Sequence, residues 1–119
     1  MPAPAYHFTQ NFLYQDTMLA VAQADLAAFR FVGPDGNYAG ADGAAHGVLL
    51  YDTPSGTRGT VARFGRCRIE AGGAINAGDK VVSDANGLPV AAGVDPANVI
   101  AIALTSTAAA GEPVELMVQ

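Results

Sequence analysis

Few residues of this chain have the type and spacing that catalysis or metal binding would require. The two histidines, His7 and His46, have no histidine, cysteine or carboxylate partner at the spacing of a metal motif. Ser55 lies in the turn sequence TPSG, and GPDGNYAG, residues 33–40, lacks the Lys-Ser/Thr pair of a phosphate loop. We therefore predict no catalytic residue, no metal site and no cofactor, with His46 as a surface or capping residue.

The acidic residues follow turns rather than a catalytic pattern. Aspartates in or beside turns bond to the nearby backbone, and this explains Asp35, Asp42, Asp52, Asp79, Asp84 and Asp95. Because no catalytic carboxylate pair or calcium loop is needed to explain them, we predict that the protein is not an enzyme. The alternative from another class is a small enzyme or a carbohydrate-binding β domain, which would show a concave pocket with converging polar groups.

Length and charge limit the remaining classes. The chain has 119 residues, enough for one domain with its own core, and its net charge is −5. Nucleic acid is an unsuitable partner because its phosphates require a basic surface. The sequence has no long apolar run and no signal-peptide pattern, so we expect no membrane span and assembly inside a cell. The single cysteine, Cys67, is expected to be a small buried apolar side chain.

The basic residues are unevenly distributed. Apart from Arg30, they all fall in one region: Arg58, Arg63, Arg66, Arg68 and Lys80. One interpretation is a solvated strand face paired locally with Glu70 and Asp79. The other is a patch that meets acidic groups on a partner, for which Arg63, Arg66 and Arg68 are the candidate contact residues.

The first 16 residues form a distinct segment, which we predict to be an extended N-terminal arm preceding a single β domain over residues 17–119. Tyr6, Phe8, Phe12 and Tyr14 occupy even positions, so an extended chain would place all four rings on one side. Such an arm could add a strand to a neighbouring subunit, or it could fold back and complete the core of its own domain. We treat these four rings as candidate partner contacts.

From residue 29 onward, short apolar runs alternate with clusters of Gly, Pro, Asn and Asp. This spacing predicts an all-β fold, a compact β-sandwich or barrel of short hairpins. For residues 18–29 we expect two strands joined by a turn, with an amphipathic helix as the alternative.

Two further segments give sharper predictions. Asn86-Gly87 lies between two strand-like runs, and this pair favours a type I′ hairpin turn. In the last strand Val114, Leu116 and Val118 alternate with Glu115 and Met117, as in a half-buried strand. Residues 29–64 and 79–119 also share an order of strands and glycine turns, which predicts two similar halves packed face to face.

The second half of the chain resembles the capsid decoration, or cement, proteins of tailed bacteriophages. The family's Gly-Asp-x-Val-x-Ser-Asp-x-x-Gly hairpin is matched by Gly78, Asp79, Val81, Ser83, Asp84 and Gly87. A following strand is matched at Ala103 and Leu104, and the Ala-Gly-Glu-x-Val ending at Ala110, Gly111, Glu112 and Val114. The resemblance covers roughly residues 18–119; Ala101 replaces a glycine of the pattern, and the arm has no counterpart.

The resemblance implies a compact β-tulip or clip-like domain on the outer face of an expanded icosahedral capsid. Similar proteins hold neighbouring major capsid protein subunits together, as homotrimers or homodimers, in a virion assembled in the host cytoplasm. On that basis the four rings of the arm, together with Arg63, Arg66 and Arg68, are expected to contact the capsid or a neighbouring copy. A head fibre base or a tail accessory protein is the alternative within phage structure.

Overall fold

The structure, a computed structural model, describes residues 7–8 and 14–119. These residues contain ten short strands and no helix. The predicted all-β fold is therefore confirmed. In chain order the strands are β1 (His7–Phe8), β2 (Gln15–Thr17), β3 (Phe31–Val32), β4 (Gly47–Leu49), β5 (Thr60–Ala62), β6 (Gly65–Glu70), β7 (Lys80–Ser83), β8 (Pro89–Ala91), β9 (Ala101–Ala103) and β10 (Pro113–Val118).

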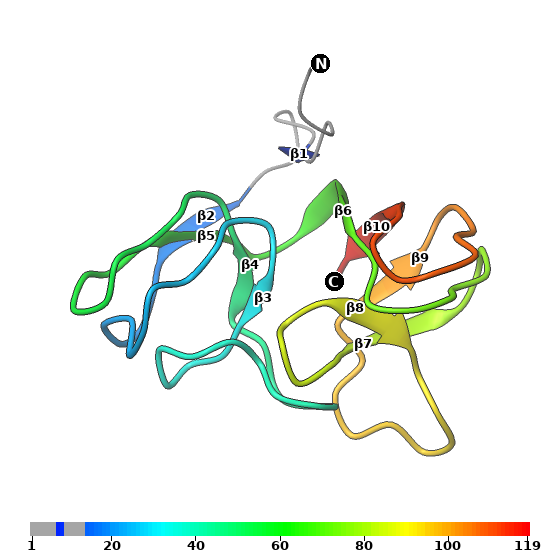
Figure 1. Ribbon diagram of the computed structural model, residues 1–119, viewed down its shortest axis with the longest axis horizontal. Helices are drawn as coiled ribbons and strands as arrows, with labels where there is room; N and C mark the ends of the chain where they lie inside the picture. The colour runs from blue at the N-terminus through cyan, green and yellow to red at the C-terminus, as the bar shows by residue number, and fades with distance from the viewer. Residues whose placement is uncertain (1–6, 9–13) are drawn as a thin grey trace.

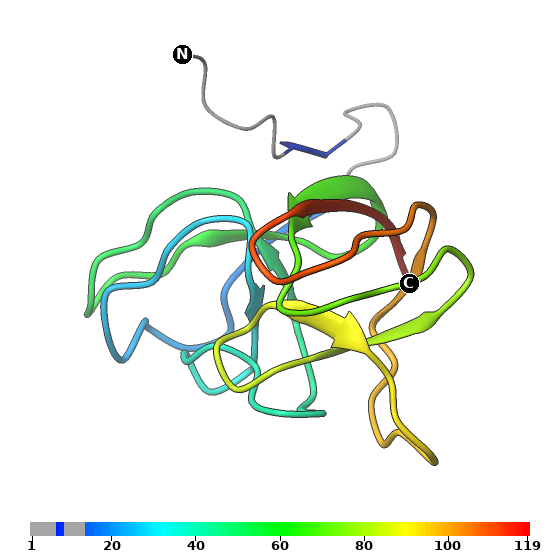
Figure 2. The same cartoon turned by 45° about the vertical axis from the view of Figure 1, so that its right-hand side comes forward.

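The strands form two antiparallel sheets (Figures 1 and 2). The six-stranded sheet has the order β1-β6-β10-β9-β7-β8, and the four-stranded sheet has the order β2-β5-β4-β3. The chain passes from the smaller sheet to the larger one through residues 63 and 64, between β5 and β6. This short connection joins the second strand of the four-stranded sheet to the second strand of the six-stranded sheet.

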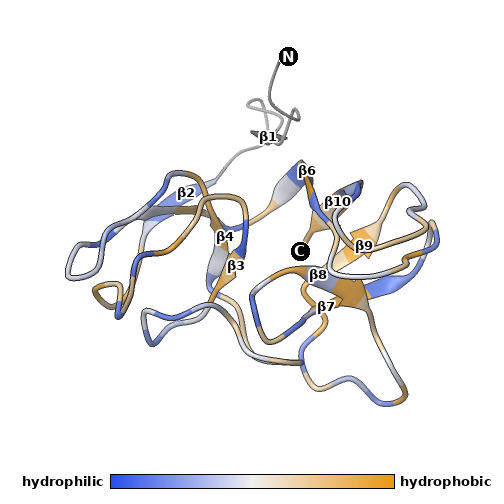
Figure 3. Ribbon diagram, in the orientation of Figure 1, coloured by the Kyte–Doolittle hydropathy of each residue, from blue (hydrophilic) through white to orange (hydrophobic). Residues whose placement is uncertain are grey.

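The main core lies between the two sheets and is built by alternating strand residues. From the four-stranded sheet it takes Phe31, Val48 and Ala62, and from the six-stranded sheet it takes residues such as Ile69 and Leu116. In β10 the buried positions are Val114, Leu116 and Val118, as the sequence predicted. Figure 3 shows the corresponding contrast between the hydrophobic β9 and the hydrophilic edge strand β2.

Cys67 belongs to the same core and is 1% exposed, which confirms the expected small buried side chain. Burial disfavours the charged thiolate and raises the pKa of this thiol to about 12, with a smaller contribution from the charge of Glu115. The thiol therefore stays protonated at neutral pH and acts as a packing group.

A second core cluster covers the other face of the four-stranded sheet. Each strand contributes a residue next in sequence to one of the main core, and adjacent residues of a strand point to opposite faces. These residues are Val32, Leu49 and Val61. They are covered by Met18, Ala22 and Leu26, which come from the segment between β2 and β3. The four-stranded sheet is thus buried on both faces.

The segment 18–29 is neither of the two forms considered from the sequence, and the preferred strand-turn-strand prediction is wrong. It runs beside residues 53–59 with widely spaced backbone bonds: Met18 N to Gly59 O at 2.9 Å, Ala22 N to Thr57 O at 2.8 Å, and Leu26 N to Thr53 O at 2.9 Å. This pairing buries every fourth residue without a helix. The segment keeps an irregular backbone because it must follow a twisted sheet face.

The predicted hairpin at Asn86-Gly87 exists, but its turn is not type I′. That turn requires positive φ at both central residues, and only Gly87 has it, at 77°. The Gly87 N–H donates to Asp84 O at 3.2 Å and the Asp84 N–H donates to Leu88 O at 2.8 Å, as in a three-residue loop with a left-handed glycine. Asp84 Oδ1 also accepts from the N–H groups of Asn86 and Leu88, and this fixes the loop.

Matching contacts recur in the two predicted halves, 29–64 and 79–119, together with the segments that precede them. The bridge between Leu26 and Thr53 has a counterpart between Ile75 and Thr107. The Gly36 N–H donates to Gly33 O, and the corresponding Gly87 N–H donates to Asp84 O. The Gly56 N–H donates to Ala22 O, and the corresponding Gly111 N–H donates to Ala71 O. These contacts support the proposal of two similar halves, which stays a prediction.

We predict that replacing Gly47 by alanine destabilises the fold. Gly47 begins β4, and a Cβ at this position would press on the carbonyl oxygen of Ala62 and lie 3.0 Å from its carbonyl carbon. Because the obstacle is backbone, we expect Gly47→Ala to lower the free energy of unfolding by roughly 1–3 kcal/mol. Gly40→Ala is the control, since nothing lies within 4 Å of its added Cβ. Equal denaturant midpoints for the two variants would contradict this account.

Candidate docking site

Two exposed aromatic rings lie at the junction of the sheets. Tyr14 immediately precedes β2, and Phe64 lies in the connection between β5 and β6. Tyr14 is 51% exposed and Phe64 is 45% exposed. The centroids of their rings are 5.4 Å apart, and the angle between the ring planes is 49°. Exposed aromatic pairs of this kind are typical of protein-binding surfaces, because they offer large contact area at little loss of side-chain entropy.

An arginine completes this group, which we call the Tyr14 cluster and which consists of Tyr14, Arg63 and Phe64. The guanidinium carbon of Arg63 lies 5.9 Å from the centroid of the Tyr14 ring, in a cation–π arrangement. The Arg63 N–H donates to Tyr14 O at 2.9 Å, which continues the pairing of β2 with β5 by one residue. The cluster is therefore fixed to the sheet through its backbone as well as through its side chains.

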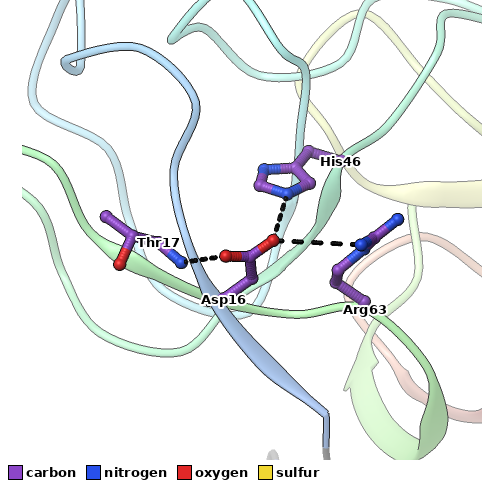
Figure 4. Close-up of polar contacts among 4 residues, drawn as sticks. All are labelled: Asp16, Thr17, His46 and Arg63. Carbon is purple, nitrogen blue, oxygen red and sulfur yellow. Dashed lines mark hydrogen bonds and ion pairs between the residues drawn. The ribbon is translucent and has the colours of Figure 1, made fainter.

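Asp16 contacts Arg63 of the cluster and also His46 and Thr17 (Figure 4). Its Oδ2 lies 3.2 Å from His46 Nε2 and 3.9 Å from a guanidinium nitrogen of Arg63, and its Oδ1 accepts from the Thr17 N–H at 2.8 Å. The hydrogen bond from His46 is the largest cause of a lowered pKa of Asp16, followed by the bond from Thr17. The carboxylate is thereby kept charged opposite Arg63.

His46 is a correction to the sequence analysis, which expected a surface or capping residue. Its side chain is only 6% exposed, and Nδ1 is buried without a hydrogen-bond partner. An ionised carboxylate can only accept a hydrogen bond, so His46 Nε2 is the donor to Asp16 Oδ2. We infer that His46 positions Asp16 rather than offering a ligand at the surface.

The arginines of β6 lie apart from the Tyr14 cluster. Arg66 and Arg68 occupy the outer face of the strand, since Cys67 and Ile69 between and after them are buried. Arg66 Nε lies 3.9 Å from Glu115 Oε1, a loose and exposed pair that contributes little to stability. Arg63 thus pairs with Asp16 and Arg66 with Glu115. The local pairing predicted with Glu70 and Asp79 does not occur among the described residues.

The structure describes only part of the predicted arm. Tyr6 and Phe12 lie outside the described residues, and of Phe8 only its backbone pairing with Cys67 is placed, through β1. Residues 15 and 16, which the sequence analysis assigned to the arm, lie in β2 of the four-stranded sheet. Tyr14 is therefore the one predicted ring whose surroundings are described.

Three residues of the site were missed from the sequence: Asp16, His46 and Phe64. Phe64 gave no clear signal, because its exposure together with Arg63 is seen only in the burial pattern of the fold. No local signal pointed to Asp16 and His46, since they are 30 positions apart and meet only in the fold.

Other chemistry has little support in the described part of the molecule. No group of three or more metal-ligating side chains comes together there. It likewise holds no helix with the length and hydrophobicity of a membrane span. Two shallow depressions, of about 220 and 300 Å³, share Asp25, Leu26 and Asp52 in their walls.

These features define a class: an all-β domain with an exposed, preorganised aromatic and cationic surface. Residues 14–119 match the family model described as phage cement protein, and the chain belongs to this family. The resemblance noted in the sequence is therefore confirmed, and the protein is a structural component of a phage. No curated protein matches the chain.

A solved structure gives the same architecture. The head fiber gp8.5 N base in bacteriophage phi29 superposes with a TM-score of 0.68 and 20% sequence identity, over 91% of this chain and 95% of that one. At this level of identity the likeness concerns the fold.

We predict that Asp16→Asn lowers stability at neutral pH and that the difference from the unchanged protein disappears in acid. A carboxylate whose pKa is lowered by folding stabilises the fold above its ordinary value of 3.8, and this stabilisation is lost as the pH falls below that value. Denaturant unfolding of both proteins across this range measures the difference. Asp95→Asn, on an exposed loop, controls for the loss of one negative charge, and a pH-independent difference for Asp16→Asn would contradict the prediction.

Proposed function

We propose that the protein binds the outer surface of an expanded phage capsid and stabilises contacts between neighbouring major capsid protein subunits. The observation that carries this proposal is the Tyr14 cluster, an exposed aromatic and cationic group on a member of the phage cement family. The family supplies the setting, and the cluster supplies a surface suited to a protein partner.

The cluster has the composition of a binding hot spot. Tyrosine and arginine are enriched among residues whose truncation weakens protein complexes, and aromatic rings bury large areas. Backbone pairing with Arg63 restrains Tyr14, and the Tyr14 ring lies next to the Phe64 ring and the Arg63 guanidinium. A site held in this way loses little conformational entropy when it binds.

The arm and the remaining arginines extend the proposed contact. Tyr6, Phe8 and Phe12 precede Tyr14 in the chain, and we propose that they continue the same surface, on the capsid or on a neighbouring copy. Arg66 and Arg68 are proposed capsid or inter-subunit contacts. By family analogy the assembly is a homotrimer, with a homodimer as the alternative, on the outer face of the capsid of a virion assembled in the host cytoplasm.

Such a protein would stabilise the shell by mass action. A ligand that binds only the assembled form shifts the equilibrium toward it, and many copies on one shell add their contributions. A rigid domain of short hairpins suits this role because its surface is already formed before binding.

A second candidate function is the base of a head fibre. It is favoured by the similarity in fold to the phi29 head fiber N base. A tail accessory protein is a further alternative from the sequence. Electron microscopy of virions would separate these functions by the position of the additional density: a regular coat indicates cement, an elongated projection a fibre, and density at the tail an accessory protein.

We predict that Tyr14→Ala combined with Phe64→Ala weakens binding to expanded capsids by about 10- to 100-fold, since truncation of a hot-spot residue costs about 1 kcal/mol or more. Co-sedimentation with capsids lacking the protein measures the affinity. Tyr51→Ala is the matched control, because Tyr51 is 64% exposed and lies outside the cluster. Equal loss of binding in the control, or none in the double variant, would contradict the assignment.

We also predict that deletion of residues 1–13 weakens binding to capsids but leaves the thermal unfolding midpoint within a few degrees. The truncation removes β1, which pairs with β6 through only two residues, and it keeps Tyr14 and Asp16, so the contacts of Asp16 with His46 and Arg63 survive. The same co-sedimentation assay, together with circular dichroism, tests both parts. Full binding by the truncated chain would mean that Tyr6, Phe8 and Phe12 contribute nothing to the contact.

A further inference from the structure

The outer face of the six-stranded sheet carries two rows of side chains in register. In the first row, Arg66 of β6 is opposite Met117 of β10, Met117 is opposite Ile102 of β9, and Ile102 is opposite Lys80 of β7. The second row contains Arg68, Glu115 and Leu104. We call these seven residues the outer rows.

The outer rows have an apolar centre with cations at both ends. Met117 and Leu104 are 40% and 42% exposed, and Ile102 between them is half-buried. Arg66 and Lys80 close the two ends of the first row. Neither Arg68 nor Lys80 has an ion-pair partner among the described residues, and Arg66 reaches only Glu115, at 3.9 Å. Within the outer rows three cations therefore face one carboxylate around exposed apolar side chains, and Glu70, the next outward residue of β6 after Arg68, adds a second carboxylate beyond the second row.

The rest of the chain has the opposite charge. Of its 6 basic and 11 acidic residues, the outer rows hold three and one, which leaves three basic against ten acidic residues elsewhere. The two shallow depressions described above combine this charge with apolar walls. Their shared wall contains Asp25, Leu26 and Asp52, and Pro54 and Tyr38 extend it on either side.

The aspartates of this depression each keep one oxygen available. Asp25 Oδ1 accepts from the Ser55 N–H at 2.9 Å, and Asp52 Oδ1 accepts from the Ala28 N–H at 2.9 Å. The second oxygen of each has no partner among the described residues. The carboxylates are thus held in place by the backbone, with charge left to meet a cation.

We infer that the outer rows bind the acidic depression of a second copy of this chain. Each surface has an apolar centre, and the charges around the two centres are of opposite sign. The four-stranded sheet and its loops lie on the left of Figure 1, and β9 and β10 lie on the right, so the two surfaces belong to different ends of the molecule. The contact is therefore head-to-tail, and repeating it produces a ring if the rotation closes.

This inference rests on the proposed function only for its setting. Of the two partners proposed above for Arg66, the capsid and a neighbouring copy, it assigns the neighbouring copy. Charges at the rim of an interface mainly set orientation and the rate of association, and salt screens them. The self-association is thus expected to weaken as the salt concentration rises.

A charge exchange tests the contact. Arg66→Glu with Lys80→Glu reverses the outer rows, and Asp25→Lys with Asp52→Lys reverses the depression. Each double variant alone should sediment as a monomer. An equimolar mixture should associate with the two variants alternating, because the reversed rows of the first variant match the reversed depression of the second, and the unchanged rows of the second match the unchanged depression of the first. If the lysine variant fails to fold, Asp25→Asn with Asp52→Asn replaces it, because the amide oxygens can still accept both backbone hydrogen bonds. This variant should also lose self-association, since it removes both charges.

Arg58→Glu and Asp95→Lys are the controls, since they reverse single exposed charges elsewhere on the surface and should sediment like the unchanged protein. An unchanged protein that is monomeric, variants that associate normally, or a mixture of folded reversed variants that stays monomeric would each overturn the inference. If the protein coats capsids but the charge exchange has no effect, only this inference falls. If the charge exchange governs self-association but capsids are not bound, only the proposed function falls.

Discussion

Burial of the four-stranded sheet on both faces is the constraint on which the rest of the structure depends. Neighbouring residues such as Phe31 and Val32 are both fully buried, although they point to opposite sides of the sheet. One face packs against the six-stranded sheet, and the other needs a separate cover. The chain provides it with Met18, Ala22 and Leu26, at the expense of regular secondary structure in that segment.

This cover also determines the position of the candidate docking site. The segment 18–26 can lie on the sheet only if β2 first pairs with β5, and that pairing places Asp16 beside Arg63. Tyr14 then falls next to Phe64, where the chain crosses to the larger sheet. The exposed cluster is thus a consequence of how the second core is closed, and it inherits the rigidity of that core.

Patterns that repeat along the chain predicted much of the fold. The alternation in β10 and the glycine turns depend on local conformation, so the sequence is sufficient for them. The segment 18–29 could not be predicted in this way, because its burial every fourth residue comes from pairing with residues 53–59 and not from a helix. At Asn86-Gly87 the location was predictable, but the turn type depends on Asp84, whose side chain bonds the loop.

The site was less accessible to prediction because its residues interact across the fold. Tyr14 and Arg63 were recognised by residue type, whereas the contacts of Asp16 with Arg63 and His46 require the pairing of β2, β5 and β4. His46 illustrates the physical reason: a histidine before a strand has no local partner in the sequence, yet in the fold its ring is buried and donates to a carboxylate. Polar contacts between residues far apart in the sequence, such as that of His46 with Asp16, therefore have to be found in the fold, because local patterns leave these side chains without a partner.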